Sequence, residues 1–195
     1  MSRLIRLPRL QGMMLKRIAH ARIHRLERAM DYDMTYVHEI VDAGGYEALA
    51  PLAALAKLSA YRRDVPIDVY YGAKITSVMA ADCGPCAQLV ASMAERDGVS
   101  PEVLRALVAG DREALSHDVQ LGVDLASAAL IGADDGAVRE EIVARWGQRA
   151  LISLAYAIVA AQAYPTLKYA LGYGKACTKV RVAGTEVAPH ALVPA

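Results

Sequence analysis

The stretch from residue 82 to residue 97 reads DCGPCAQLVASMAERD. It carries two cysteines, Cys83 and Cys86, separated by a glycine and a proline. Asp82 is a candidate N-cap, and Pro85 fits the first turn of a helix, where a missing N–H costs little. Apolar residues then recur with a helical period, at Leu89, Val90, Met93 and Ala94. The stretch therefore predicts a helix that begins with two thiols.

The spacing of the two cysteines suits a redox dithiol. Helix positions three apart have Cβ atoms about 5–6 Å apart, and a small adjustment of the first turn brings them within disulfide range. A thiol at a helix N-terminus also faces the positive end of the helix dipole, which favours the reactive thiolate. Cys86 and Cys83 are therefore the candidate catalytic residues.

Two other interpretations of the cysteine pair remain open, half of a zinc site and two small core residues. A structural zinc ion takes four ligands, usually from two such pairs. His20 and His24 can share a helix face, but they lie far upstream of the dithiol, in an unusual order for a zinc finger. We therefore predict no metal and no cofactor. The remaining thiol and imidazole groups of the chain are Cys177, His38, His117 and His190.

Composition indicates one sizeable core rather than a fibrous or disordered chain. Apolar residues make up 55% of the 195 residues, and the mean hydropathy is +0.22. The formal charge of +1 gives no indication of a nucleic-acid partner. The longest apolar run, residues 151–164, is too short to cross a bilayer, so we expect no membrane span. Few cysteines and no secretory pattern predict a cytoplasmic protein, where a CxxC motif is more often catalytic than structural.

The first 30 residues are strongly basic. They carry eight Lys and Arg residues, and Glu27 is their only acid, so their net charge is +7. A solvated helical arm explains this pattern most simply. An organelle transit peptide, a segment that binds an anionic surface, and a helix that packs on a partner subunit are the alternatives.

The remaining patterns are helical, and strand signals are almost absent, so the sequence predicts an all-α fold. We divide it into an N-terminal helical extension (1–60), a helical domain (61–177) and an irregular C-terminal tail (178–195). Pro165 is expected to kink or split the last helix. The predicted helices are 11–30, 32–42, 47–61, 67–81, 83–97, 101 to about 110, 117–130, 136–146, 148–164 and 166–173.

The order of these features is similar to a known family. One helix leads into the CxxC motif, a second helix follows, a break at 97–100 precedes Pro101, and a long apolar helix comes last. This pattern, over residues 66 to 173, resembles the carboxymuconolactone decarboxylase superfamily in its alkylhydroperoxidase D-like branch. The resemblance implies a multi-helix bundle, a homo-oligomer and a thiol-dependent antioxidant peroxidase.

The family motif in that branch is a Glu, eleven residues, CxxC, three residues and a His. The cysteines match Cys83 and Cys86, whereas the Glu position is Tyr71 and the His position is Val90. The resemblance implies that Cys86 attacks the peroxide and that Cys83 resolves the product into a disulfide. It also implies that the proton relay is missing. Tyr71 and Lys74 are possible substitutes, although a packed tyrosine and a solvated lysine explain them more simply.

Two functions of different classes follow. The first is a peroxidase or disulfide oxidoreductase that uses a hydroperoxide or disulfide substrate and an external dithiol reductant. The alternative is a non-enzymatic helical oligomer, a redox sensor or binding module that kept the scaffold and lost the relay. Cys177 is expected to be a buried thiol rather than a third redox partner.

Overall fold

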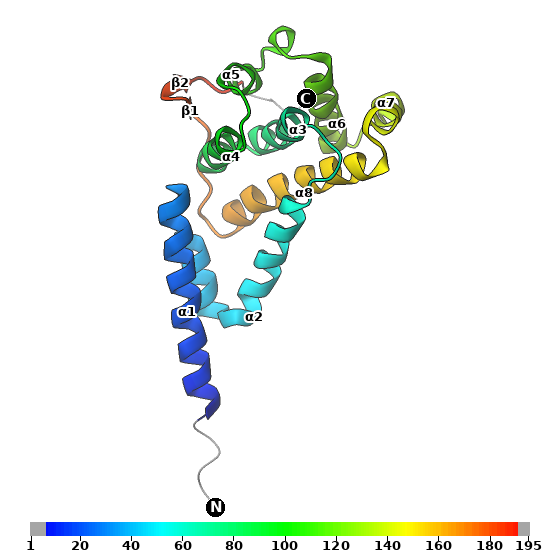
Figure 1. Ribbon diagram of the computed structural model, residues 1–195. Helices are drawn as coiled ribbons and strands as arrows, with labels where there is room; N and C mark the ends of the chain where they lie inside the picture. The colour runs from blue at the N-terminus through cyan, green and yellow to red at the C-terminus, as the bar shows by residue number, and fades with distance from the viewer. Residues whose placement is uncertain (1–6, 191–195) are drawn as a thin grey trace, which may run out of the picture. The chain divides into compact units, whose positions relative to one another are not determined.

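The computed structural model describes the backbone of residues 7–190 and the side chains of residues 12–190 (Figure 1). Over this range the chain forms eight α-helices, one short 3-10 helix and one two-stranded sheet. The predicted all-α fold is therefore confirmed. The side chains of Arg3, Arg6 and Arg9 in the basic segment, and residues 191–195 of the predicted tail, lie outside the described part.

The elements follow one another along the chain with short connections. In order they are α1 (Leu7–Met30), α2 (Thr35–Ala60), α3 (Ile67–Ala80), α4 (Gly84–Arg96), α5 (Pro101–Ala109), η1 (Arg112–Ala114), α6 (His117–Ile131), α7 (Gly136–Trp146), α8 (Gln148–Ala170), β1 (Val180–Val182) and β2 (Thr185–Val187).

The chain divides into two compact units, of which the first ends at Ala56 and the second begins at Lys57. The first unit contains α1 and most of α2, and hydrogen bonds connect these two helices. Lys16 donates to the backbone oxygen of Asp42 at 2.7 Å. Helix α2 breaks at Gly45, whose φ is +63°. The glycine break predicted between residues 42 and 47 therefore lies inside a helix with a kink.

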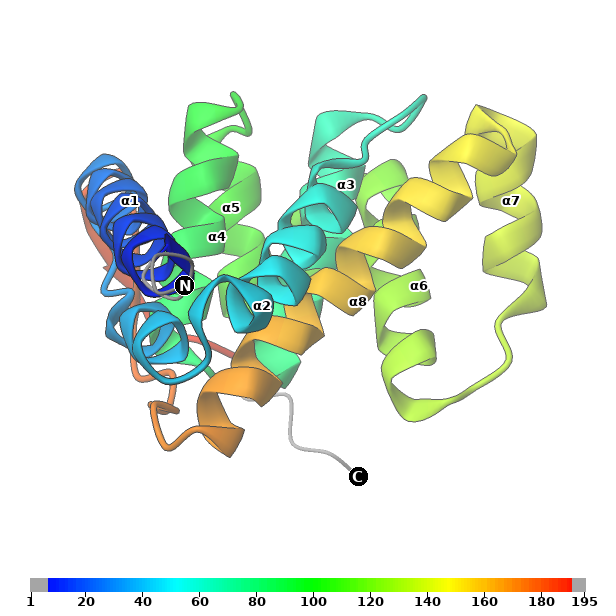
Figure 2. The same ribbon diagram turned by 90° about the horizontal axis from the view of Figure 1, so that it is seen from below.

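Helix α3 is the centre of the second unit. All side chains from Val69 to Met79 are buried, as expected of a helix surrounded by other elements. Helices α4, α5, α6 and α8 pack around it (Figures 1 and 2). Helix α6 approaches especially closely, because a Cβ atom on Gly122 would lie 2.4 Å from the backbone oxygen of Val69. A glycine at this position therefore sets the spacing of α3 and α6.

Helix α8 differs from its prediction, because it continues through Pro165 to Ala170 instead of splitting there. Pro165 lacks the N–H of a regular helix bond, and its side chain is buried within the continuous helix.

Helix α8 is, within the described residues, the one helix whose length and apolar composition would suit a membrane crossing. At 23 residues it is longer than the fourteen-residue run that the sequence suggested. Many of its apolar side chains, among them Leu154 and Ile158, belong to the main core, and the charged side chain of Lys168 is buried. A core helix of a globular protein meets the same criteria, so a membrane span is not indicated.

The C-terminal segment contains a β-hairpin where the sequence predicted an irregular tail. Strand β1 pairs antiparallel with β2, in a register that places Val180 opposite Val187. Val180 and Val182 are fully buried, whereas Arg181 between them is exposed. Gln88 of α4 accepts the Arg181 N–H at 2.7 Å and donates to its oxygen at 3.0 Å. The hairpin is thus fastened to the helix that carries the dithiol.

Candidate active site at the dithiol

The two cysteines lie together at the start of α4, as predicted. Cys83 is the N-cap residue, with extended φ and ψ, and Cys86 lies in the first turn. Their Cα atoms are 5.3 Å apart, and their sulfur atoms are within disulfide-bonding distance. Both side chains are buried, Cys83 completely and Cys86 with an exposed fraction of 4%. The two sulfur atoms are therefore paired and buried inside the protein.

Gly84 lies where another backbone segment passes close to the turn, so this position has no room for a side chain. Its N–H donates to the backbone oxygen of Lys175 at 2.9 Å. A Cβ atom on Gly84 would lie 2.7 Å from the oxygen of Ala176 and 3.1 Å from the Cα of Cys177. No residue with a side chain fits without a shift of that backbone. The segment 175–177 thus lies directly against the turn between the two cysteines.

Asp82 does not cap α4, contrary to the sequence prediction. It has a φ of +46°, and its carboxylate oxygen accepts the N–H of Cys177 at 2.9 Å. The hydroxyl of Tyr169 donates to the backbone oxygen of Asp82 at 2.8 Å. Asp82 therefore holds the 175–177 segment beside the dithiol instead of pairing with helix N–H groups.

Cys177 is a free and half-buried thiol beside this turn. Burial raises the pKa of the Cys177 thiol, and the nearby Asp82 carboxylate raises it further. Both effects disfavour the thiolate, which is the nucleophilic form. Cys177 is thus half-buried rather than fully buried as expected, and its raised pKa does not favour an attacking role.

The residue at the family's Glu position does not point its polar group to the dithiol. The Tyr71 hydroxyl donates at 2.9 Å to Asp97, the C-cap residue at the far end of α4 from the cysteines. Arg62 contacts the same carboxylate oxygen at 3.3 Å. Burial, followed by the hydrogen bond to Asp97, raises the pKa of Tyr71. Val90, at the family's His position, is a buried apolar residue.

Lys74 is buried rather than solvated, so that expectation is wrong. Its ammonium lies 5.6 Å from the ring centre of Tyr70 and 5.7 Å from that of Tyr71. Burial lowers the pKa of Lys74 to about 8, although the charge of Asp97 opposes this. Lys74 lies six positions, about 9 Å of helix, before Ala80 at the end of α3. Its partners are thus the tyrosines and Asp97.

Sequence reasoning missed three contributors to these surroundings: Asp97, Arg62 and the 175–177 segment. Asp97 lies 26 residues from Tyr71, and Cys177 lies 95 residues from Asp82. No local pattern brings such residues together. The one available signal was Gly84, since a glycine between two cysteines indicates a close backbone approach.

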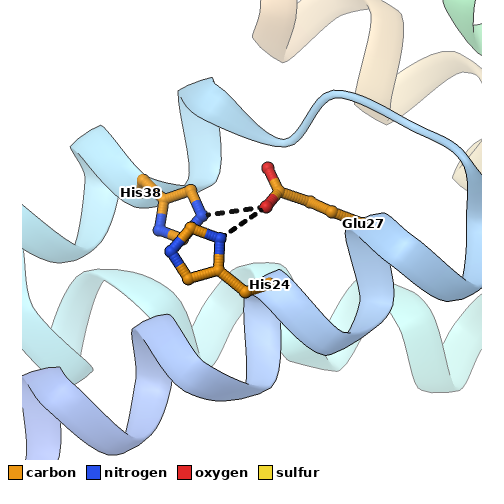
Figure 3. Close-up of side chains that lie close together, drawn as sticks. All are labelled: His24, Glu27 and His38. Atoms are coloured by element: carbon orange, nitrogen blue, oxygen red, sulfur yellow. Dashed lines mark hydrogen bonds and ion pairs between the residues drawn. The ribbon is translucent and has the colours of Figure 1, made fainter.

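A second group of polar side chains lies in the first unit. The sequence paired His20 with His24 as possible ligands, but the structure brings His24 together with Glu27 and His38. One donor atom from each of these three residues lies within 4.8 Å of the others (Figure 3). This is a candidate metal centre separate from the dithiol.

Comparisons of the chain with protein-family models, with curated proteins and with solved structures found no match.

Proposed function

We propose that this protein is a thiol-dependent oxidoreductase that reduces small hydroperoxides through Cys83 and Cys86. The observation that carries the proposal is the close pairing of the two cysteines at the N-terminus of α4. A helix N-terminus stabilises negative charge, which favours the thiolate that attacks an oxidant. The resemblance to the alkylhydroperoxidase D-like branch, described above, supports the same chemistry.

The proposed cycle has three balanced steps. The Cys86 thiolate attacks a peroxide oxygen and breaks the O–O bond, which leaves a sulfenic acid on Cys86 and releases an alcohol after protonation. The Cys83 thiol then attacks that sulfur, forms the disulfide and releases water. An external dithiol transfers two electrons and two protons to the disulfide and becomes oxidised itself.

Burial limits which substrates reach the sulfur atoms. Cys86 exposes 4% of its surface and Cys83 none, so a small hydroperoxide is favoured over a protein disulfide. The reductant is expected to attack the sulfur of Cys86, the more accessible of the two. The 175–177 backbone crosses the same turn, and its displacement would admit a larger dithiol.

The missing relay predicts slow turnover. General acid–base help contributes on the order of a hundred- to ten-thousandfold. Val90 has no proton to transfer, and Tyr71, with its raised pKa, is directed at Asp97. Proton transfer would therefore depend on solvent or on the reductant.

One observation favours the alternative, a redox sensor that reacts once and signals. The dithiol turn is hydrogen-bonded to a distant segment through Gly84 and Asp82. Opening and closing of the disulfide would move this connection and hence the C-terminal hairpin. A sensor of this kind needs no efficient relay.

We also propose that the protein is cytoplasmic and forms a homo-oligomer. A reducing compartment supplies the dithiol that the cycle needs. Helix α1 exposes apolar side chains, among them Met13, Met14, Leu15 and Ile18, and an exposed apolar patch suits an interface between copies.

Steady-state consumption of a small organic hydroperoxide, with dithiothreitol as reductant, tests the enzyme. We expect many peroxide molecules reduced per chain in the wild type and in Cys177→Ser, and none above background in Cys86→Ser. A single equivalent consumed, followed by arrest with dithiol still in excess, would favour the sensor. Equal turnover in Cys86→Ser would exclude both.

A further inference from the structure

In the hairpin formed by α1 and α2, three side chains bring potential metal-ligand atoms close together. Nδ1 of His24 lies 2.8 Å from Oε2 of Glu27, and Nε2 of His38 lies 3.4 Å from the same oxygen (Figure 3). A tetrahedral zinc ion, with bonds of about 2.0–2.2 Å, holds its ligand atoms about 3.4 Å apart, so the His38 contact already has this spacing and His24 would have to move slightly away from Glu27. Two imidazoles and one carboxylate thus converge from two helices.

The Glu27 carboxylate is positioned to act as a metal ligand. The other oxygen of Glu27 accepts the backbone N–H of Met34 at 3.0 Å, which fixes the orientation of the group. A carboxylate oxygen held in one orientation loses less freedom when it binds a divalent cation.

A second layer of hydrogen bonds orients His38. Its Nδ1 lies 2.6 Å from Nδ1 of His20, and Nε2 of His20 lies 2.9 Å from a carboxylate oxygen of Asp42. If His38 donates to His20 and His20 donates to Asp42, both contacts are satisfied and Nε2 of His38 keeps a free lone pair. Metal-bound histidines are characteristically oriented in this way by a donated N–H.

We propose that His24, Glu27 and His38 bind a divalent transition-metal ion of the zinc class. Two imidazole nitrogens and one carboxylate oxygen are a ligand set typical of zinc. The His24 side chain is 61% exposed and that of His38 is 16% exposed. The site is therefore open to solvent on the His24 side, where water would complete the coordination of the ion.

The ion would join α1 to α2, because His24 and Glu27 belong to α1 and His38 belongs to α2. In its absence, the hydrogen bond between His38 and Glu27 joins the same two helices. An ion that binds only the folded hairpin stabilises it by mass action. This proposal does not depend on the chemistry of the dithiol.

Titration of the full chain with Co²⁺, followed by competition with Zn²⁺, tests the site. We expect one bound ion per chain and the visible absorption of a low-coordinate cobalt site, which Zn²⁺ abolishes. His38→Gln and Glu27→Gln should each weaken binding by at least about tenfold. His117→Gln is the matched control, because His117 also faces a glutamate, Glu141, at 2.8 Å, and within the described part of the chain no third ligand joins them.

The cysteines need a separate control, because thiolates also bind zinc and cobalt. We expect a variant with Ser at positions 83, 86 and 177 to bind cobalt as the wild type does, without thiolate-to-cobalt charge-transfer absorption. Binding that disappears in this variant, or that survives in His38→Gln, would overturn the proposal. A wild type that binds no ion would also overturn the proposal, because the three side chains would then form only a hydrogen-bonded cluster.

The role of His20 as a positioning residue has its own readout. His20→Leu removes the acceptor for His38 and should weaken cobalt binding by about 10–100-fold. His20→Gln keeps an acceptor and should restore most of the affinity. Zn²⁺ should also raise the unfolding temperature of the wild type but not that of His38→Gln.

Discussion

The turn between the two cysteines shows how single residues shape the site. Cys83 and Cys86 are placed by local rules, a helix start and a spacing of three, and their pairing follows from sequence alone. Asp82 is different, because its carboxylate accepts the N–H of Cys177 instead of capping the helix. Its partner lies 95 residues away, and no local pattern predicts such a contact.

Gly84→Ala tests the close approach of the 175–177 backbone. The new Cβ would lie 2.7 Å from the Ala176 oxygen, so we expect the free energy of unfolding to fall by about 1–3 kcal/mol, as overpacking typically costs. Gly136→Ala is the control, because its Cβ would meet only Arg139, at 3.9 Å. Denaturant unfolding measures both. A Gly84→Ala protein as stable as the control would contradict this packing.

Val90→His tests whether a missing proton relay limits turnover. Val90 lies four residues after Cys86, so both face the same side of α4. We expect an imidazole there to raise peroxide turnover by about a hundredfold, the lower end of general acid–base help. Leu89→His carries the same group about 100° around the helix and should not raise it. A folded Val90→His protein with no gain would show that proton transfer is not limiting.

At the scale of elements, the helices follow from sequence because their signals are local. Ser100 caps α5 by accepting the N–H of Val103, and Gly110 ends it with a φ of +70°. The β-hairpin was missed because its strands are three residues long. Its position also depends on Gln88, which the sequence places 93 residues away. Such tertiary contacts determine short strands more than propensity does.

Lys74 on α3 makes stability depend on pH in a predictable direction. Its pKa is about 8 in the folded protein and near 10.4 when unfolded. Between these values the unfolded chain binds more protons, so the free energy of unfolding rises with pH. The neighbouring Tyr70 and Tyr71, whose pKa values are raised, oppose this only above about pH 10.

Cys177, whose pKa is also raised, opposes this gain, so the comparison is made in a Cys177→Ser background, in which we expect stability to rise from pH 8 to pH 10 by at most about 1.4 kcal/mol per pH unit. Lys74→Met should lose this gain, whereas Lys175→Met, which removes an exposed lysine, should keep it. Unfolding in urea at several pH values measures the slope. Equal slopes with and without Lys74→Met in this background would show that Lys74 titrates normally.

At the scale of the whole molecule, composition predicted a large apolar core and helical periodicity predicted an all-α fold, both of which the structure has. Composition does not predict whether copies of the chain associate, because association depends on which apolar side chains stay exposed on the surface. Met14 and Ile18, four residues apart on α1, are 59% and 43% exposed. This spacing puts them on one face of the helix.

Light scattering should therefore give a mass that is a multiple of 20.9 kDa. We expect the double substitution Met14→Glu with Ile18→Glu to reduce that mass, because it places charges on the α1 face. Ile131→Glu replaces an isolated exposed apolar residue of the second unit and should leave the mass unchanged. A wild type of 20.9 kDa at micromolar concentration would contradict the homo-oligomer.

Cys86 is proposed to be the peroxide-reactive thiol of a redox dithiol. The most direct measurement is mass spectrometry of reduced Cys83→Ser treated with one equivalent of hydroperoxide and a sulfenic-acid trap. Without Cys83 the sulfenic acid cannot become a disulfide with it, so we expect a trapped adduct on Cys86 and none on Cys177. An adduct on Cys177 alone, or unreacted Cys86 after the peroxide is consumed, would contradict it.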